Sequence, residues 1–275
     1  MPKLAADGYT AQISRRGAGI CMLRHGDRDL LTSWPEDGPA PFYAATILAP
    51  WPNRVAFARY VFAGHTHVLP VNEPERGHAL HGLVAEADWR ITDARDDLVR
   101  LEHTIPVSPG YPSSLDLRVE HRLGGGGLTT TVTARNVGGH AAPYGCGTHP
   151  WLLGDVLELH AAQVLETDGD LLPVRLADVP GTPYDFATPR QVGGQVIDNA
   201  YTGLRRGEAR AGGVRVSWDP DVLPWVQVCT SHQLGYEGLA VEPMTCPPDA
   251  FNSQVGLVVL RPGDEHVASW TISAV

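Results

Sequence analysis

The feature that most constrains the fold of this chain is an alternation of apolar and polar residues with the period of a β-strand. In residues 114–123 (SLDLRVEHRL) the leucines, Val119 and His121 fall on one face and polar residues on the other. Residues 128–136 (LTTTVTARN) repeat the pattern, and the glycines at 124–127 separate the two runs. Two alternating runs joined by a short glycine-rich turn predict an antiparallel hairpin with a flexible tip.

Shorter runs of the same kind recur along the chain, at 98–105, 156–160, 163–167, 214–218, 225–230, 257–261 and 266–273. Beyond short turns, the sequence shows no amphipathic pattern long enough for a helix of about three turns. The 30 glycines and 23 prolines are spread along the chain, and both residues favour turns over long regular elements. The sequence therefore predicts an all-β protein built as a large antiparallel β-sandwich.

Length and composition set the scale of this sandwich. The chain has 275 residues, of which 43% are hydrophobic and 19% charged, which is enough apolar material for a sizeable core. The sequence contains no serine-rich or charged linker and no internal repeat, and the glycine run at 124–127 is too short to join two domains. We therefore expect one domain over residues 1–275.

The charge distribution excludes several classes of partner. The net charge is −10, and arginines and lysines are scattered, whereas a nucleic-acid binder would concentrate them on one face. No apolar run approaches the roughly 20 residues that span a bilayer, so we expect no membrane contact. A neutral polyol is compatible with this balance, while a strongly anionic ligand would need a local basic pocket.

The first residues and the cysteines indicate where the protein works. Residues 1–10 (MPKLAADGYT) lack the hydrophobic segment of a secretion signal. Cys21, Cys146, Cys229 and Cys246 lie far apart and form no C-x-x-C pair, which is typical of buried thiols in a reducing compartment. We expect a cytoplasmic protein, and the sequence leaves open whether it is a monomer or a homodimer.

Candidate functional segments mix polar residues with glycine and proline where an ordinary strand would not. They are 50–54 (PWPNR), 79–83 (ALHGL), 144–152 (YGCGTHPWL), 239–253 (LAVEPMTCPPDAFNS) and, less markedly, 197–204 (IDNAYTGL). Loops at the ends or over the face of a β-scaffold are where binding sites are usually built.

Glu242 is the first candidate for chemistry. It follows the apolar run LAV and precedes Pro243, so we expect it where a strand ends. In an apolar cleft a carboxylate loses hydration, and its pKa rises toward the range useful for a general base. A solvated glutamate at the end of a strand is the alternative interpretation, and spacing alone favours it.

His149 and His81 are candidates of the same kind. A histidine can donate a proton near neutral pH, but taken alone each residue is better explained as a core histidine with one satisfied nitrogen. Together with Glu242 they could bind Zn or Fe(II), yet no two of them share a local metal-binding motif. The pair His65 and His67 fits a surface hairpin. We therefore expect no metal site and no cofactor.

Other motifs of known mechanism are missing from the sequence, which has no Walker A loop, no G-x-S-x-G elbow and no G-x-G-x-x-G turn opening a helix. The aromatic residues could stack on the apolar faces of sugars, although core packing is the default for each: Trp51, Phe57, Tyr144, Trp151 and Trp225. From residues alone, the inference ends at a β-sandwich that could hold a polyol in a cleft.

An ordered set of short motifs extends over nearly the whole chain. It runs PNR at 52–54, VFAGHTHVLPVN at 61–72, LHG at 80–82, GTHP at 147–150, TPYDF at 182–186, IDNAY at 197–201, EPMTCPPDAFN at 242–252 and LRPGDE at 260–265. Each motif is weak alone, but in this order the chain resembles the aldose 1-epimerase family, the galactose mutarotase-like proteins. That resemblance implies a galactose mutarotase-like supersandwich whose concave face binds one sugar.

The resemblance also implies an activity and its two catalytic groups. The activity is the interconversion of the α and β anomers of a hexose by ring opening and closure, without a cofactor. Glu242 corresponds to the base that takes the proton from the anomeric hydroxyl. His149 corresponds to the acid that protonates the ring oxygen. The rate should then show a bell-shaped dependence on pH.

Four more residues receive substrate-binding roles. By resemblance, Arg54 and His81 hydrogen-bond sugar oxygens, and Asp198 grips ring hydroxyls. Trp151, two residues after the acid, is expected on the wall that faces the sugar. The small-molecule partner implied by this set is an aldohexose.

The sequence departs from the family pattern at two places in that wall. Better-known galactose mutarotases have Asn-His-x-Tyr-Phe around the acid, where this chain has Thr-His-Pro-Trp at 148–151. They also carry a glutamine two residues after the base, where this chain has Met244. The preference for galactose or glucose therefore stays open.

Two alternative functions remain at this point. A hexose-6-phosphate 1-epimerase would need a basic cluster around the phosphate, for which Arg54, Arg59 and Arg76 are candidates, but the overall charge is acidic. A non-catalytic carbohydrate-binding or sensor protein on the same fold could dispense with the acid or the base. The presence of both a glutamate and a histidine at these positions favours an enzyme.

Overall fold

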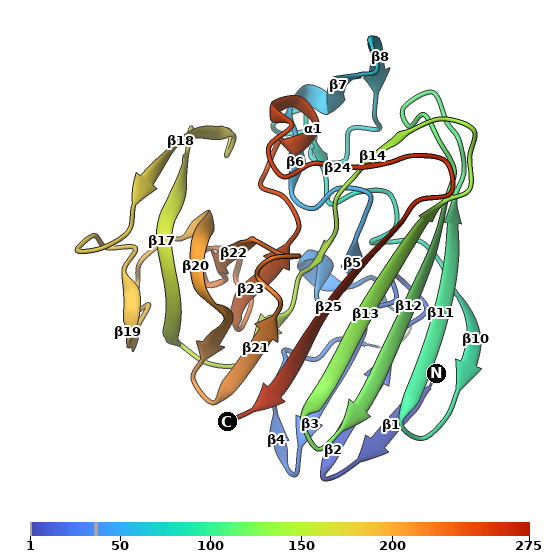
Figure 1. The fold of residues 1–275 in the computed structure, drawn as a ribbon. Coiled ribbons are helices and arrows are strands. Elements are labelled where there is room, and N and C mark those ends of the chain that lie inside the picture. The colour runs from blue at the N-terminus through green and yellow to red at the C-terminus, as the bar shows by residue number, and fades with distance from the viewer. Residues whose placement is uncertain (1, 36–37) are drawn as a thin grey trace.

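The computed structural model describes residues 2–35 and 38–275, and their regular structure is almost all antiparallel β-sheet (Figure 1). The large sheet consists, in chain order, of β5 (Ile47–Leu48), β10 (Arg90–Ala94), β11 (Leu98–Ile105), β12 (Leu115–Gly124), β13 (Gly127–Asn136), β15 (Gly147–Thr148), β16 (Trp151–Leu152), β17 (Val156–Thr167), β18 (Pro173–Asp178), β19 (Phe186–Gln191), β20 (Asp198–Ala211), β21 (Val214–Trp218), β22 (Trp225–Thr230), β23 (Leu239–Met244) and β25 (Glu265–Ala274). The all-β prediction is confirmed.

Smaller elements complete the fold. A second sheet contains β1 (Lys3–Ala6), β2 (Tyr9–Ile13), β3 (Ile20–His25) and β4 (Arg28–Asp29). Three strand pairs join β6 (Arg54–Val55) to β9 (Ala79–Leu80), β7 (Arg59–Phe62) to β8 (His65–Val68), and β14 (Ala142–Tyr144) to β24 (Val258–Leu260). The α-helix α1 spans only Ala250–Ser253, and within the described part of the chain no helix is long and apolar enough to cross a membrane.

The predicted hairpin is the pair β12 and β13, aligned from Leu115 opposite Asn136 to Gly124 opposite Gly127. Its apolar face is buried as the alternation predicts, and His121 is buried with it. The runs at 156–160 and 163–167, predicted as separate strands, form one strand, β17. A register shift between Leu159 and Ala161 absorbs the break in the pattern, because a bulge lets a strand continue through an irregular residue.

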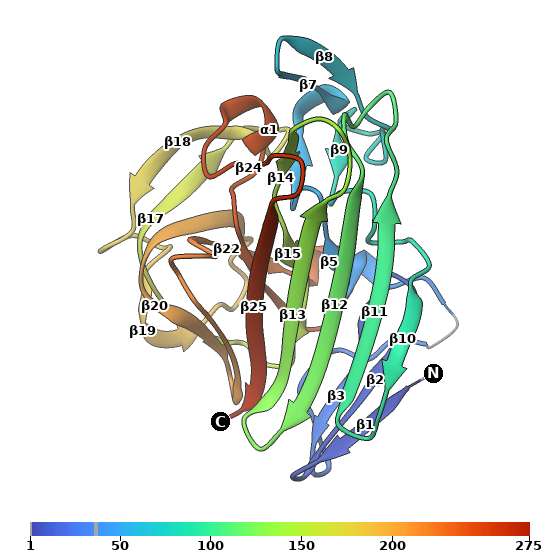
Figure 2. The same ribbon diagram turned by 45° about the vertical axis from the view of Figure 1, so that its right-hand side comes forward.

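The main core lies between the two sheets. Apolar residues of β1–β3, such as Leu4, Ala11 and Leu23, belong to the same buried cluster as Val119 and Val132 of the large sheet. Figure 2 shows the long strands β11–β13 and β25 running side by side, with β1–β3 behind β11 and β12. Burying one face of each sheet against the other removes apolar surface from water, which is the main driving force for this arrangement.

Candidate active site

Three polar side chains share one face of β20, β22 and β23. In the cross-strand register, Gln227 lies opposite Glu242 and Asp198 lies opposite Cys229. Directly opposed residues of antiparallel strands point to the same face, as do residues two apart along a strand. The register therefore places Asp198, Gln227 and Glu242 on the face that does not contribute to the main core.

The structure corrects the predicted position of Glu242, which lies inside β23 rather than at its end. The strand continues through Pro243 because the backbone N–H that proline lacks would point to the side of β23 where β15 and β16 are interrupted. The N–H of Val241, two residues earlier, donates to the carbonyl of Pro150, and β15 and β16 are interrupted at residues 149–150. A proline is tolerated where the sheet ladder is already open.

The same interruption positions His149. Residues 149–150 lie between β15 and β16, and their backbone is not part of either pairing with β23. The His149 side chain lies next to β23. His149 Nε2 lies 3.3 Å from Glu242 Oε1, and the two side chains are 8% and 1% exposed. The residues assigned as acid and base, 93 positions apart in sequence, are thus in direct contact. The second oxygen, Glu242 Oε2, has no hydrogen-bond partner among the described residues.

Burial controls the charge of this pair. It raises the pKa of Glu242 well above its usual value, with nearby Asp198 raising it further and Arg54 opposing the rise. Burial lowers the pKa of His149 to about 4. Both shifts favour the neutral forms, because a low-dielectric environment disfavours charge. Between the lowered pKa of His149 and the raised pKa of Glu242 the pair therefore holds one proton, and both shifts favour that proton on the carboxyl group in the unliganded protein.

His81 is fixed by an exchange of hydrogen bonds with Asn53. The backbone N–H of Asn53 donates to His81 Nδ1 at 3.2 Å, and the backbone N–H of His81 donates to the carbonyl of Asn53 at 2.8 Å. With Nδ1 an acceptor, Nε2 carries the proton and is the free donor. Burial, and then the proximity of His149, hold the pKa of His81 well below its usual value.

The backbone around His81 explains two of the sequence motifs. Asn53 and His81 both have positive φ, 56° and 60°, a conformation that non-glycine residues rarely adopt and that clusters at functional sites. The next residue, Gly82, has φ 79°, and a Cβ atom there would lie 2.1 Å from the carbonyl oxygen of Ala49. The motifs PNR and LHG therefore encode one tight junction between β6 and β9.

Arg54 is held by a residue that the sequence analysis did not single out. Its Nε and Nη2 donate to Glu73 Oε2 and Oε1, each at 2.9 Å, in a bidentate ion pair whose side chains are 9% and 5% exposed. Burial alone would lower the pKa of Arg54, but the hydrogen bonds to Glu73 hold it above its ordinary value. Glu73 Oε1 also accepts from Arg76 at 3.0 Å.

Asp198 is held by a second residue that was missed. Gln227 Nε2 donates to Asp198 Oδ1 at 2.6 Å, while Gln227 Oε1 has no partner among the residues described, although the side chain is almost fully buried. Burial raises the pKa of Asp198, and Arg54 and Gln227 oppose that rise. A signal for Gln227 existed, since it is a polar residue between two valines of a strand-like run. Glu73 had no such signal.

Trp151 lies behind the surface rather than on it. The indole is 1% exposed, its Nε1 donates to the carbonyl of Phe42, and its ring lies 5.1 Å from that of His149. Phe42 and Tyr236 pack against it at 6.4 and 5.4 Å between ring centroids. Of these three aromatic residues Phe42 is the exposed one, at 42%.

The remaining candidates fall outside this cluster. His65 and His67 lie on the exposed hairpin of β7 and β8, as predicted. Met244 packs with Trp225, Leu165 and Ala200 in a small buried cluster of its own. Across residues 2–35 and 38–275, no group of three or more His, Cys, Asp or Glu side chains is arranged to hold a metal ion.

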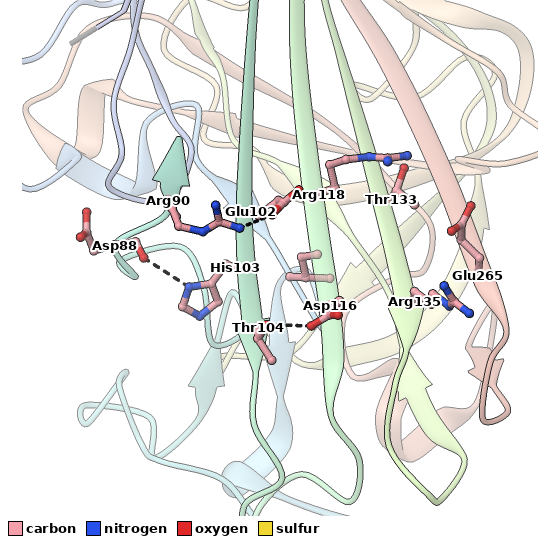
Figure 3. Close-up of a pocket in the computed structure, with 11 residues that line it drawn as sticks. Asp88, Arg90, Glu102, His103, Thr104, Asp116, Arg118, Thr133, Arg135 and Glu265 are labelled. Atoms are coloured by element: carbon pink, nitrogen blue, oxygen red, sulfur yellow. Dashed lines mark hydrogen bonds and ion pairs between the residues drawn. The ribbon is translucent and has the colours of Figure 1, made fainter. Parts of the chain in front are cut away.

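A second polar region lies elsewhere on the large sheet. A groove of about 560 Å³ on the outer face of β11, β12, β13 and β25 is lined by charged and hydroxyl side chains, among them Arg90, Glu102, Asp116, Arg118 and Arg135 (Figure 3). None of the six residues assigned from the sequence lines it. The candidate active site is therefore the buried cluster around Glu242 and His149.

Comparison with known proteins places this arrangement in a family. The model of the aldose 1-epimerase family matches residues 3–273, and the chain belongs to that family. The uncharacterized protein YihR of Escherichia coli strain K12 is 35% identical, with 96% of this chain and 89% of that protein aligned. The galactose mutarotase of Mus musculus is 24% identical, over 96% of this chain and 90% of the mouse protein.

Solved structures show the same fold at lower sequence identity. The GalM/aldose epimerase homologue from C. elegans has a TM-score of 0.84 and 19% identity, covering 100% of this chain and 98% of the other. Galactose 1-epimerase from Lactobacillus acidophilus NCFM has a TM-score of 0.80 and 18% identity, covering 98% and 92%. The predicted galactose mutarotase-like sandwich is confirmed.

Proposed function

We propose that the chain is an aldose 1-epimerase that interconverts the α and β anomers of a hexose. The observation that carries this proposal is the contact of 3.3 Å between Glu242 Oε1 and His149 Nε2 in a buried site. The anomeric hydroxyl and the ring oxygen are bonded to the same carbon. Two side chains in mutual contact can therefore reach both atoms of one hemiacetal.

Ring opening needs a base at the anomeric hydroxyl and an acid at the ring oxygen. A pair that holds one proton supplies both when the proton lies on His149 and Glu242 is ionised. Hydroxyl groups of the bound sugar replace the hydration that burial removed from the carboxylate, which favours this form of the pair. After rotation about C1–C2, the reverse transfers close the ring on the other face and restore the starting state.

The surrounding side chains orient the sugar. His81 offers the N–H of Nε2, Asp198 offers a carboxylate, and Gln227 offers the carbonyl oxygen that lacks a partner. Arg54 supplies the N–H groups that Glu73 does not use. Directed hydrogen bonds of this kind fix a polyol, and exposed Phe42 provides an apolar surface for a sugar face.

The same ion pair bears on the phosphorylated alternative. Arg54 is paired with Glu73, and Arg76 with Glu73 and Glu75, so both guanidinium groups already have carboxylate partners and neither is a free charge for a phosphate. We therefore favour the free hexose over the hexose 6-phosphate as substrate.

Polarimetry tests the proposal. Freshly dissolved α-D-glucose, α-D-galactose and their 6-phosphates would be followed with and without protein, and at least one free hexose should reach anomeric equilibrium faster with it. Acceleration confined to the phosphates would support the phosphorylated alternative. Binding without acceleration of any sugar would support the non-catalytic sensor.

A further inference from the structure

We propose that Glu73 is a positioning residue that orients Arg54 for sugar binding. This inference rests on the proposed function, and it concerns a residue that contacts neither Glu242 nor His149 in any recorded hydrogen bond or ion pair. The structural basis is a buried, bidentate ion pair within the candidate site.

The local backbone fixes Glu73 firmly. Its carbonyl accepts hydrogen bonds from the backbone N–H of Gly77 at 2.8 Å and of Arg76 at 3.2 Å, which closes a tight turn. An isolated bridge with His78 ties this turn to the chain that enters β9. The carboxylate is therefore presented from a constrained loop, and a constrained partner imposes its geometry on the arginine.

The geometry of the guanidinium shows what Glu73 leaves free. The two oxygens of Glu73 accept hydrogen bonds from Nε and Nη2 of Arg54, and these two donors form one side edge of the guanidinium. Asn53 Oδ1 accepts a third hydrogen bond, from Nη1, at 3.3 Å. The remaining N–H bonds on Nη1 and Nη2 lie along the end of the planar fork. Rotation of the guanidinium would break both bonds to Glu73, so these donors keep one direction.

Charge is the second part of the argument. Arg54 is 8% exposed, and a buried cation without a partner is costly. Arg54 also stabilises the ionised forms of Asp198 and Glu242. By compensating Arg54, Glu73 limits how strongly that cation acts on the two acidic groups. Loss of the Glu73 charge should therefore make both of them easier to ionise.

A double-mutant cycle tests this role, with Arg76→Gln as the matched control. Arg76 contacts the same Glu73 oxygen from the outside and is 30% exposed, so its loss removes an ion pair without freeing Arg54. The variants are Glu73→Gln, Arg54→Gln and the two combined. They would be assayed by polarimetry with α-D-galactose and α-D-glucose, with thermal unfolding to establish that each is folded.

The expected result is specific to positioning. Glu73→Gln should raise KM on the order of tenfold, the cost of misdirecting a charge-assisted hydrogen bond, and lower kcat less. The alkaline limb of its pH profile should move to lower pH. If Glu73 acts only through Arg54, the double variant should match Arg54→Gln within about twofold. Arg76→Gln should resemble the wild type. The double variant removes both members of the buried Arg54–Glu73 pair, so it should fold even if Glu73→Gln alone does not.

Other outcomes overturn the inference. An unchanged KM and pH profile in folded Glu73→Gln would do so, as would equal effects of Glu73→Gln and Arg76→Gln. The inference would also be overturned if the fold-changes in KM of Glu73→Gln and Arg54→Gln multiplied in the double variant, because the two residues would then act independently. If the wild type accelerates no sugar, the proposed function fails separately. In that case the Kd for D-galactose is measured for each variant by NMR titration. Equal Kd values for the wild type and Glu73→Gln, or no binding by the wild type, would overturn the role of Glu73.

Discussion

Polar side chains gather on two regions of the large sheet. In both regions, antiparallel pairing places polar residues directly opposite one another on neighbouring strands. On the outer face of the sheet, Glu102 lies opposite Arg118, and Asp116 lies opposite Arg135. In the candidate site, Gln227 lies opposite Glu242 on β22 and β23. Figure 3 shows the outer side chains spread over the strands, in an open groove.

The two regions differ in their access to water. The outer ion pair of Arg90 and Glu102 joins atoms 2.5 Å apart, but the side chains are 73% and 40% exposed. The inner pair of Arg54 and Glu73 is no shorter, at 2.9 Å, yet its side chains are 9% and 5% exposed. Water screens the first pair and cannot reach the second. Contact distance alone therefore does not distinguish the two ion pairs, whereas desolvation does.

The largest effect should come from the pair proposed to be catalytic, Glu242 and His149. Glu242→Gln and His149→Asn should each lower kcat by about 10²–10⁴-fold, the usual contribution of general acid–base catalysis. The two changes together should cost little more than either alone, because the groups act as a unit. Polarimetry measures the effect, and Glu102→Gln in the outer groove is the control with unchanged activity. A loss of less than tenfold in either variant would remove that residue from the mechanism.

The ion pairs should differ in their contribution to folding. Arg54→Gln leaves the carboxylate of Glu73 buried, with only Arg76 as a partner, and should lower the free energy of unfolding by about 3–5 kcal/mol. Arg90→Gln should change it by less than about 1 kcal/mol. Urea denaturation of both variants at the same pH gives the comparison. Equal losses in the two variants would mean that burial does not set the value of an ion pair here.

The smallest effect is a displacement of the pH profile. Burial lowers the pKa of His149 to about 4 and raises that of Glu242, so the pair keeps a single proton between these two values. The ratio kcat/KM should decrease as the pH drops below about 4, because His149 is then protonated while Glu242 is still protonated. It should fall again above the raised pKa of Glu242, where the pair loses its only proton. The spontaneous rate is subtracted at each pH. An acid limb near the ordinary histidine value would contradict the lowered pKa.

Much of the fold followed from the sequence alone. Alternation is a local property, because side chains two residues apart share a face, and it located β11, β12, β13, β21 and β22 to within a residue. Where a bulge changed the register, as between Leu159 and Ala161 in β17, the pattern broke although the strand did not. Alternation cannot distinguish a bulge from a strand end, since both interrupt the period.

The candidate site divides along the same line. Ordered motifs led to Glu242, His149, Arg54, His81 and Asp198, and the structure brings these residues into one cluster. Two motifs, PNR and LHG, proved to be halves of one junction, which no local pattern could show. This chain has Met244 where better-known members of the family have a glutamine, but Gln227 on the neighbouring strand places an amide opposite Glu242. The sequence around Met244 could not show this.

The chain by itself determined which residues can be strand, turn, acid or base, because these are properties of side chains and their immediate neighbours. Only the tertiary structure decided which of them lost water, that Glu73 meets Arg54, and that Trp151 lies behind Phe42. Desolvation and long-range pairing depend on segments that are distant in sequence. They exist only once those segments have packed together.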